Sequence, residues 1–327
     1  MKENQQVPIR WAIIGVGVVA REMAEAMKSL GRVPAAVGNR TQEKAVEFAK
    51  TYGIPKVYLD LEDAFRDPDI DALYLTTPHS THHELLLKAL EGGKHVLCEK
   101  SITLGSHQLE EVMNVAQEKG LVLGEAMTLY HMPLYKTLKR RLEAGDFGRI
   151  NLIQCSFGSF KDYDMNNRFF RLEDGGGALL DIGVYALSLV RWFMESNPDR
   201  MESLVKFAPS GADEMSGILL MNPEGQLGVL SLSLHSKQPK RAVISGELAY
   251  VEILEYPRAT QARIVWTNDG RVEELIEEEG SALVYELLDM EKAIGGDGSL
   301  MHLDLTRDVL LTMTELRRGW GLRYPHE

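Results

Sequence analysis

Cysteine is the scarcest residue in this chain, with two, Cys98 and Cys155, among 327 residues. Two cysteines are too few for the disulfide framework of a secreted domain, so we expect a reducing, cytoplasmic location. Long apolar runs are missing too, because none reaches the roughly 18 residues that a membrane-spanning helix needs. The opening residues, MKENQQVPIRWAIIG, are polar and then strand-like, without the basic start and apolar core of a signal peptide.

Positive charge is also in deficit. The chain has 36 Lys and Arg against 48 Asp and Glu, which gives a net charge of −12. A chain of this charge is a poor partner for the phosphates of nucleic acids, so we predict no nucleic-acid binding. The histidines show no spacing that is typical of a metal site, and we predict none. These absences, with no predicted membrane span, leave a small molecule as the expected partner.

The overall composition is that of a globular protein, 44% hydrophobic and 26% charged. The length exceeds that of one ordinary core, so we predict two domains, residues 1–125 and 126–327. In the first, apolar runs such as IRWAIIG and DALYLTTP alternate with helical patterns such as VVAREMAEAMKSLG. This alternation predicts an α/β Rossmann domain, a parallel sheet with helices on both faces.

Beyond residue 125 the pattern changes. Strand-like segments such as QLGVLSLSL and YVEILEY follow one another, and the turn NPEGQ joins two of them as a hairpin. In LGVLSLSLHS, apolar residues alternate with small or polar ones, which is typical of a sheet with two different faces. We predict an α+β domain with an open, mostly antiparallel sheet. A final helix, 302–319, is a candidate to pack back on the first domain.

The sequence G-x-G-x-x-A occurs between the first strand and the first helix, from Gly15 to Ala20. Gly15 permits the tight turn, and Gly17 lets the backbone approach a pyrophosphate. Val18 and Val19 open the helix, whose amino-terminal amides favour an anion. A tight turn without a ligand is the alternative, but the position in the first strand–helix unit favours a dinucleotide site.

The end of the second strand bears on the choice of cofactor. An NAD site usually has Asp or Glu there to hold the ribose hydroxyls. This chain has Asn39 and Arg40 instead, and the Arg40 guanidinium is suited to a 2′-phosphate. We therefore favour NADP, with NAD still open. The alternative for Arg40 is a surface side chain at the start of a helix.

Three further segments complete a known pattern: TTPHSTHHE (76–84), HVLCEKSITL (95–104) and GGGALLDIGVYAL (175–187). Over nearly its whole length the chain resembles the glucose–fructose oxidoreductase / inositol dehydrogenase / MocA family. The resemblance implies a Rossmann domain followed by an open α+β domain. It also implies hydride transfer between a nicotinamide and a carbinol carbon of a sugar, polyol or related compound. A tyrosine in the third segment places the resemblance with the family's tyrosine branch, which includes dimeric dihydrodiol dehydrogenase and NADP-dependent xylose dehydrogenases.

The family's Glu-Lys-Pro signature corresponds to Glu99, Lys100 and Ser101. The resemblance implies that Glu99 and Lys100 lie at the nicotinamide, and the carboxyl end of a strand is where ligands of such sheets bind. Because a cis bond before a residue other than proline costs about 3 kcal/mol, we expect a trans bond before Ser101. The alternative for Lys100 is a surface lysine after a buried strand.

Asp181 and Tyr185 are four residues apart, so on a helix they share one face. By resemblance, both are catalytic. Tyr185 would exchange the hydroxyl proton, although a free tyrosine has a pKa near 10. A nearby Lys100 ammonium would lower that pKa, and Asp181 would accept a hydrogen bond from the substrate or from Lys100. The alternative is a core tyrosine bonded to a buried aspartate.

Other polar positions are candidates of lower rank. Thr77, Pro78 and His79 follow the fourth strand, where the family's loop touches the cofactor. His82 matches a histidine often found there, and a helix-start histidine is the alternative. Before the glycine run, Arg168 and Arg171 would reach the substrate or brace their loop.

Three functions remain open at this point. The leading one is an NAD(P)-dependent oxidoreductase acting on a sugar or polyol. A trans-dihydrodiol dehydrogenase and a non-catalytic regulator that senses NADP are the alternatives. The apolar rows that helices leave exposed on the second sheet predict a homodimer or homotetramer formed through that sheet.

Overall fold

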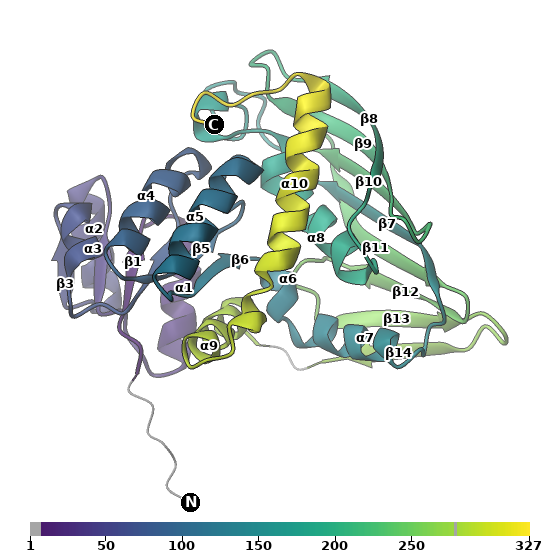
Figure 1. The fold of residues 1–327 in the computed structure, drawn as a ribbon, viewed down its shortest axis with the longest axis horizontal. Coiled ribbons are helices and arrows are strands. Elements are labelled where there is room, and N and C mark those ends of the chain that lie inside the picture. The colour runs from purple at the N-terminus through teal and green to yellow at the C-terminus, as the bar shows by residue number, and fades with distance from the viewer. Residues whose placement is uncertain (1–7, 278–279) are drawn as a thin grey trace, which may run out of the picture. The chain divides into compact units, whose positions relative to one another are not determined.

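The computed structural model describes residues 8–277 and 280–327, and the chain divides into two compact units. Unit 1 comprises the described part of Met1–Ile102 together with Glu110–Ala126 and Leu287–Met301. Unit 2 comprises Thr103–Leu109, Met127–Glu286 and His302–Glu327. Each unit is built around its own sheet (Figure 1).

The sheet of unit 1 is parallel, with the strand order β3-β2-β1-β4-β5-β6. Its strands are β1 (Trp11–Ile14), β2 (Ala36–Gly38), β3 (Lys56–Tyr58), β4 (Ala72–Leu75), β5 (His95–Glu99) and β6 (Leu123–Ala126). The helices that lie wholly in this unit are α1 (Val18–Ser29), α2 (Gln42–Tyr52), α3 (Leu61–Arg66), α4 (His79–Glu91) and the short 3-10 helix η3 (Gly298–Met301). Helices α5 (Ser106–Glu118) and α9 (Ala282–Ile294) have residues in both units.

Strands β1 and β4 are buried along their whole length, as expected for central strands covered on both faces. The alternating runs of the sequence therefore predicted this parallel sheet correctly. The strand order reverses between β1 and β4, because the chain builds outward from β1 in one direction and from β4 in the other. In open sheets of this kind, ligands bind beyond the carboxyl ends of the strands at such a reversal.

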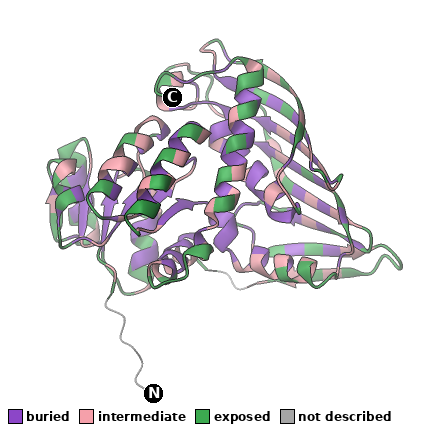
Figure 2. Cartoon of the chain, in the orientation of Figure 1, coloured by how far each residue is buried: buried purple, intermediate pink, exposed green. Residues whose placement is uncertain are grey.

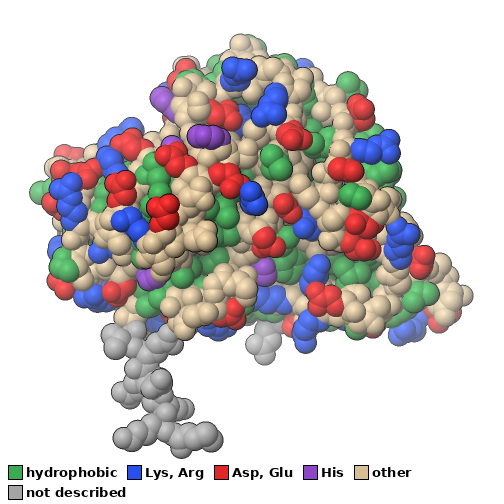
Figure 3. All heavy atoms as spheres, viewed as in Figure 1, with side chains coloured by type: hydrophobic (Ala, Val, Ile, Leu, Met, Phe, Trp, Pro, Cys, Tyr) green, Lys and Arg blue, Asp and Glu red, His purple; other side chains and the backbone are tan. Residues whose placement is uncertain are grey.

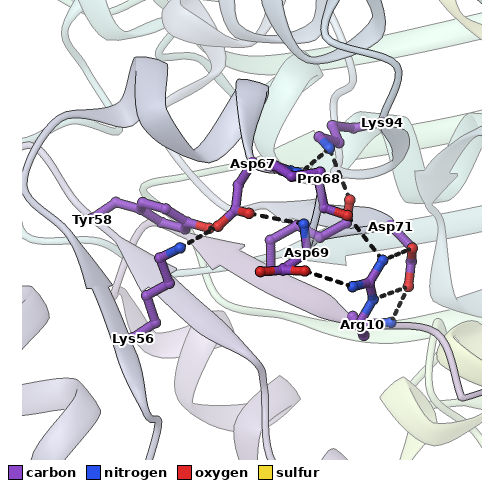
Figure 4. Close-up of polar contacts among 9 residues, drawn as sticks. Arg10, Lys56, Tyr58, Asp67, Pro68, Asp69, Asp71 and Lys94 are labelled. Atoms are coloured by element: carbon purple, nitrogen blue, oxygen red, sulfur yellow. Dashed lines mark hydrogen bonds and ion pairs between the residues drawn. The ribbon is translucent and has the colours of Figure 1, made fainter.

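A network of hydrogen bonds and ion pairs connects three segments of unit 1 (Figure 4). The buried Asp67 carboxylate accepts hydrogen bonds from the Lys56 ammonium and the Tyr58 hydroxyl. Those bonds hold the pKa of Asp67 well below its usual range, the bond from Lys56 contributing most. Nearby, Arg10 binds both carboxylate oxygens of Asp71, at 2.8 and 2.9 Å. These groups tie β3, the start of β1 and the segment before β4 together.

The sheet of unit 2 has the order β14-β13-β12-β11-β7-β10-β9-β8. Within this sheet, only β7 and β10 pair in parallel among the described strands, so the predicted mostly antiparallel sheet is confirmed. The strands are β7 (Ile150–Gly158), β8 (Arg200–Phe207), β9 (Asp213–Met221), β10 (Leu227–Ser233), β11 (Gln238–Gly246), β12 (Ala249–Leu254), β13 (Gln261–Trp266) and β14 (Val272–Ile276). The helices are α6 (Thr128–His131), α7 (Pro133–Glu143), α8 (Val184–Phe193) and α10 (Leu303–Trp320), with short turns η1 (Leu172–Asp174) and η2 (Leu179–Gly183).

One face of this sheet is covered by helix. Helix α8 packs on β7, and α10 packs on α8 and β8. Along β9 and β10, buried residues alternate with more exposed ones, as the change of colour along these strands shows (Figure 2). The predicted hairpin joins β9 to β10, with Leu227 opposite Met221.

One segment of the described residues, Leu172–Phe193, passes a test of length and hydropathy for a membrane span. The same segment is the core of unit 2, since 83% of its most apolar window is buried. We therefore interpret it as a core helix that packs on the sheet.

Candidate active site

The glycine motif of unit 1 forms the expected turn between β1 and α1. Gly15 has φ +102°, and a Cβ there would lie 2.6 Å from the Thr76 carbonyl oxygen. Only glycine fits this position. At Gly17, which precedes the first helical residue, Val18, a Cβ would meet nothing within 4 Å. Open space beside the amides of a helix start, with no acidic residue in the first turn, fits the pyrophosphate of a dinucleotide.

The end of β2 carries the residues expected to bind the ribose. The Asn39 amide donates to the Thr41 carbonyl at 2.9 Å, which fixes the turn into α2. Arg40 is exposed, and it pairs with no carboxylate in the part of the chain that the structure describes. Sequence reasoning missed two further cations, Arg21 and Lys44. They line a hollow of about 190 Å³ between α1 and α2, together with Val16, Glu47, Phe48 and Thr51.

The loops after β4 and β5 meet through two histidines. The His79 Nε2 lies 3.0 Å from the Lys100 carbonyl oxygen. His82 is fully buried, and its ring nitrogens lie 2.8 Å from the Thr77 carbonyl and 3.0 Å from the Ser101 carbonyl. Burial lowers the pKa of His82, so the ring is neutral and donates to one of these carbonyls at a time. Both histidines brace the loop that carries Lys100, and their contact with a cofactor stays a prediction.

The bond between Lys100 and Ser101 is cis, so the expected trans bond was wrong. The surroundings of this bond specify its conformation. Ser101 is fully buried, the carbonyls on both sides face the two histidines, and the next amide, of Ile102, donates to Glu125 at 3.0 Å. These contacts come from parts of the chain that are distant in sequence. The free-energy cost of a cis bond in an isolated peptide does not include them, so the expectation based on that cost was wrong.

Glu99, the last residue of β5, accepts a hydrogen bond from the Tyr74 hydroxyl. Tyr74 lies in β4, the neighbouring strand of the parallel sheet. This bond fixes the carboxylate next to Lys100 at the carboxyl end of the sheet, where the fold places ligands.

In unit 2, Asp181 and Tyr185 follow one another along the chain from η2 into α8. Turn η2 is a π-helical turn, and the Asp181 amide donates to the Gly177 carbonyl at 3.2 Å. Single π turns are frequent at functional sites. The Tyr185 ring packs on Phe157 of β7, with centroids 6.2 Å apart. The structure thus places Asp181 and Tyr185 on adjacent turns of one helical segment, while Lys100 belongs to unit 1.

A second aspartate, which sequence reasoning missed, holds the start of this segment. Asp213 is fully buried, and its Oδ2 accepts the Leu179 amide at 2.7 Å. At Gly177, with φ +128°, a Cβ would lie 2.0 Å from the other Asp213 oxygen, so the run of glycines lets the carboxyl group approach. The Tyr324 hydroxyl donates to the Gly176 carbonyl at 2.9 Å. Burial raises the pKa of Asp213 to about 7.

The two arginines before the glycine run have local partners. The Arg168 guanidinium lies 4.2 Å from the ring centroid of Phe169, and Arg171 pairs with Asp174 at 3.4 Å. These contacts support the bracing alternative for Arg171, and a substrate role stays a prediction for both. Within residues 8–277 and 280–327, no three His, Cys, Asp or Glu side chains gather to hold a metal ion. On the face that Figure 3 shows, acidic and basic side chains are interspersed.

Comparison with known proteins agrees with this arrangement. The model of the oxidoreductase family with an NAD-binding Rossmann fold matches residues 9–127, and the GFO/IDH/MocA C-terminal domain matches residues 135–252. Trans-1,2-dihydrobenzene-1,2-diol dehydrogenase of Xenopus tropicalis is 31% identical over 250 residues, 75% of this chain and 74% of that protein. The enzyme of the same name from Xenopus laevis is 27% identical over 329 residues, 97% of this chain and 99% of that protein.

Solved structures share the fold. KijD10, a 3-ketoreductase from Actinomadura kijaniata in complex with NADP and TDP-benzene, has a TM-score of 0.83 at 23% identity, covering 95% of this chain and 98% of its own. UDP-N-acetylglucosamine 3-dehydrogenase GnnA from Acidithiobacillus ferrooxidans has a TM-score of 0.81 at 21% identity, covering 96% and 98%. With both of its domains matched, this chain belongs to the GFO/IDH/MocA family of NAD(P)-dependent oxidoreductases.

Proposed function

We propose that the protein is an NADP-dependent dehydrogenase or reductase for a carbinol carbon of a sugar, polyol or related diol, with Tyr185 as its acid/base. The observation that carries this proposal is the segment from η2 to α8. There Asp181 and Tyr185 lie on adjacent turns at the end of a glycine run, in a family of oxidoreductases. Both side chains are half-buried, which suits groups that exchange a proton with a bound substrate.

The chemistry assigned to each residue follows from its charge. A bound nicotinamide would supply or accept the hydride. Tyr185 takes the hydroxyl proton in oxidation and returns it in reduction. An ordinary phenol has a pKa near 10, so we assign Lys100 the role of lowering it through its positive charge. Asp181 accepts a hydrogen bond that orients the substrate hydroxyl or the lysine.

We further propose that NADP is preferred over NAD. Support comes from the exposed Arg40 at the end of β2, and from the cations Arg21 and Lys44 in the hollow between α1 and α2. No carboxylate stands at Asn39 or Arg40, where an NAD site usually has one. Arg40→Asp should raise the dissociation constant of NADPH about 10- to 100-fold and change that of NADH by less than about threefold. Equal changes in the two constants, measured by fluorescence titration, would contradict this assignment.

A trans-dihydrodiol is the second candidate substrate, because the curated relatives above bear the name trans-1,2-dihydrobenzene-1,2-diol dehydrogenase. The test is a panel of aldoses, polyols and trans-dihydrodiols mixed with the purified protein and NADP or NAD. Formation of NADPH is followed by absorbance. Turnover of at least one compound supports the proposal. Tight NADPH binding without turnover of any compound would instead favour a regulator.

We propose that unit 2 forms a homodimer, or a homotetramer, through the helix-free face of its sheet. The strand register places large apolar side chains from both ends of the sheet on that face, among them Leu204, Leu219, Leu254 and Ile276. Leu204 is 84% and Ile276 69% exposed in the single chain. Such a surface is typical of an interface. Light scattering should give a mass of at least twice the 36.7 kDa of one chain. The Leu219→Glu variant should have the mass of a single chain.

We propose a cytoplasmic location as well. Both cysteines are free thiols buried in the structure, which suits a reducing compartment. Fractionation of the cells that make the protein, with activity or antibody as the readout, tests this assignment.

A further inference from the structure

The residues that follow α10 turn back onto unit 2, and the proposed reaction assigns them no role. We call residues 321–327 the return segment. The Leu322 amide donates to the Arg317 carbonyl at 2.9 Å, and the Gln108 side-chain amide donates to the His326 carbonyl at 2.7 Å. Both ends of the return segment are therefore bonded to other parts of unit 2.

A buried arginine, Arg317 in the last turn of α10, is the centre of these contacts. The side chain is 1% exposed, and its guanidinium binds both carboxylate oxygens of Glu327, at 2.7 and 2.8 Å. It also donates to the Leu104 carbonyl at 2.6 Å, and its central carbon lies 4.8 Å from the centroid of the Tyr324 ring. A buried charge without partners is costly, so this bidentate pair fixes the return segment on α10.

Tyr324 connects the buried ion pair to the glycine run. The residue is 4% exposed, and its hydroxyl donates to the Gly176 carbonyl at 2.9 Å. On the other side of the same residue, the Gly176 amide donates to the Arg171 carbonyl at 2.8 Å. The conformation at the end of the glycine run therefore depends on where the return segment holds the Tyr324 ring.

The turn before Asp181 is held at two points. Tyr324 holds the Gly176 carbonyl, and the Oδ2 of Asp213 accepts the Leu179 amide at 2.7 Å. Between these two points, the Gly177 carbonyl accepts the Asp181 amide at 3.2 Å. The backbone that presents Asp181 is thus fixed by side chains from the return segment and from β9.

The two points also share an electrostatic environment. The groups that face the Asp213 carboxyl include the Arg317 guanidinium and the Tyr324 phenol. Burial raises the pKa of Asp213, and the positive charge of Arg317 opposes that rise. Burial also raises the pKa of Tyr324, so its hydroxyl keeps the proton that it donates. Arg317 therefore acts on both points, through the Tyr324 ring and through its charge.

We propose that the return segment positions the segment from η2 to α8 for catalysis, through three positioning residues: Arg317, Tyr324 and Glu327. The proposal rests on the proposed function, in which Asp181 and Tyr185 act on the substrate. None of the three is assigned a contact with substrate or cofactor. A small displacement of reacting groups slows the chemical step more than it weakens binding, so loss of this support should lower kcat.

The first test needs no substrate. Amide hydrogen exchange is followed by mass spectrometry in the peptide that spans Gly176 to Tyr185. Tyr324→Phe removes the bond to the Gly176 carbonyl and keeps the ring, whereas Glu327→Gln removes the charge that pairs with Arg317. Each variant should speed exchange in this peptide at least about fivefold, because its amides open more often.

The control for the charge change is Glu273→Gln. Glu273 lies on β14, at the far edge of the sheet from β9, and pairs with Arg141. Its side chain is 31% exposed, close to the 26% of Glu327. This variant should leave exchange in the peptide unchanged. Exchange at the wild-type rate in Tyr324→Phe and Glu327→Gln, or equal acceleration in the control, would overturn the proposal.

A substitution in a different segment tests the same link. At Gly105, the three atoms nearest to an added Cβ all belong to Glu327, the closest being its Oε1 at 2.3 Å. Gly105→Ala should therefore displace this flexible carboxylate from Arg317 and speed exchange in the peptide as Glu327→Gln does. Wild-type exchange in Gly105→Ala would show that the ion pair does not hold the turn.

The second test separates positioning from stability. With a substrate found in the panel, Tyr324→Phe and Glu327→Gln should each lower kcat about tenfold. KM and the NADPH dissociation constant should change less than about twofold, and Glu273→Gln should keep the wild-type kcat. The double variant of Tyr324 and Glu327 should lose no more activity than the weaker single variant, because both changes act through one bond.

An unchanged kcat in both single variants, even with faster exchange, would overturn the proposal. Additive losses in the double variant would also overturn it, since the two residues would then act separately. If the wild type turns over none of the compounds, the proposed function fails. The exchange measurement then still decides whether the return segment holds the turn before Asp181.

Discussion

The two units carry their candidate sites in different ways. In unit 1 the candidate cofactor site is mostly backbone: a glycine turn packed on a carbonyl, a helix start and a strand order that reverses between β1 and β4. In unit 2 the proposed catalytic side chains lie on a π turn and on the helix after it, and a buried aspartate 32 residues away from Asp181 along the chain accepts the first amide of that turn. A backbone site leaves a local signature in the sequence, whereas a site of side chains depends on tertiary contacts.

The same contrast explains what sequence reasoning could and could not find. The parallel sheet of unit 1 and the role of Gly15 follow from local patterns, and both agree with the structure. The cis bond before Ser101 could not be predicted, because histidines and a glutamate distant in sequence surround it. Substitutions of Gly15 and Gly17 therefore test the backbone site of unit 1 first.

The largest effect is expected from the glycine pair of unit 1. Gly15→Ala should abolish NADPH binding and unfold unit 1 at a lower temperature, because its Cβ would overlap the Thr76 carbonyl at 2.6 Å. Gly17→Ala should leave the melting temperature nearly unchanged, since its Cβ meets nothing within 4 Å, yet weaken NADPH binding at least about tenfold. Calorimetry and cofactor titration measure the two properties. Equal melting temperatures for both variants would contradict the prediction that Gly15 is required for packing and Gly17 only for space for the cofactor.

A smaller effect, on stability alone, is expected at Asp67. The folded state lowers the pKa of this carboxyl, so its stabilisation is present above the unfolded pKa and is lost as pH falls below about 4. Asp67→Asn should lower the free energy of unfolding by about 2–3 kcal/mol at neutral pH and by much less in acid. Urea titrations of the wild type and the variant at neutral pH and in acid measure this difference in the free energy of unfolding. A loss that is independent of pH would mean that the charge of Asp67 is not the cause.

The smallest effect, and one of opposite sign, is expected at Asp213 in unit 2. Burial raises its folded pKa to about 7, above the unfolded value, so its contribution to stability is fully present below about pH 4 and is lost as pH rises from there through about 7. Asp213→Asn keeps an oxygen for the Leu179 amide and removes the charge. The variant should therefore be more stable than the wild type by about 1–2 kcal/mol at and above neutral pH, with little difference below about pH 4, where the carboxyl is protonated in both states. Destabilisation at high pH would show that the ionised carboxylate is required.

Some features of unit 2 could not be predicted because their patterns are weak. Strands β8 and β14 alternate between exposed and half-buried residues, as edge strands do, and carry no strong apolar period. The pair Asp181 and Tyr185 is proposed from the family resemblance and its spacing, whereas the π turn that carries Asp181 was not predicted, and the Leu179 amide at its start donates to Asp213, which is distant along the chain.

The most direct test of the central claim, that the phenol of Tyr185 exchanges the proton of the reaction, is the turnover of Tyr185→Phe. With a substrate found in the panel, kcat should fall by about 10²- to 10⁴-fold, with the NADPH dissociation constant unchanged. Tyr285→Phe, at a half-buried position of α9 outside the residues assigned to the site, is the matched control and should retain the wild-type kcat. If Tyr185→Phe turns over at the wild-type rate, Tyr185 is not the acid/base and the proposed chemistry is wrong.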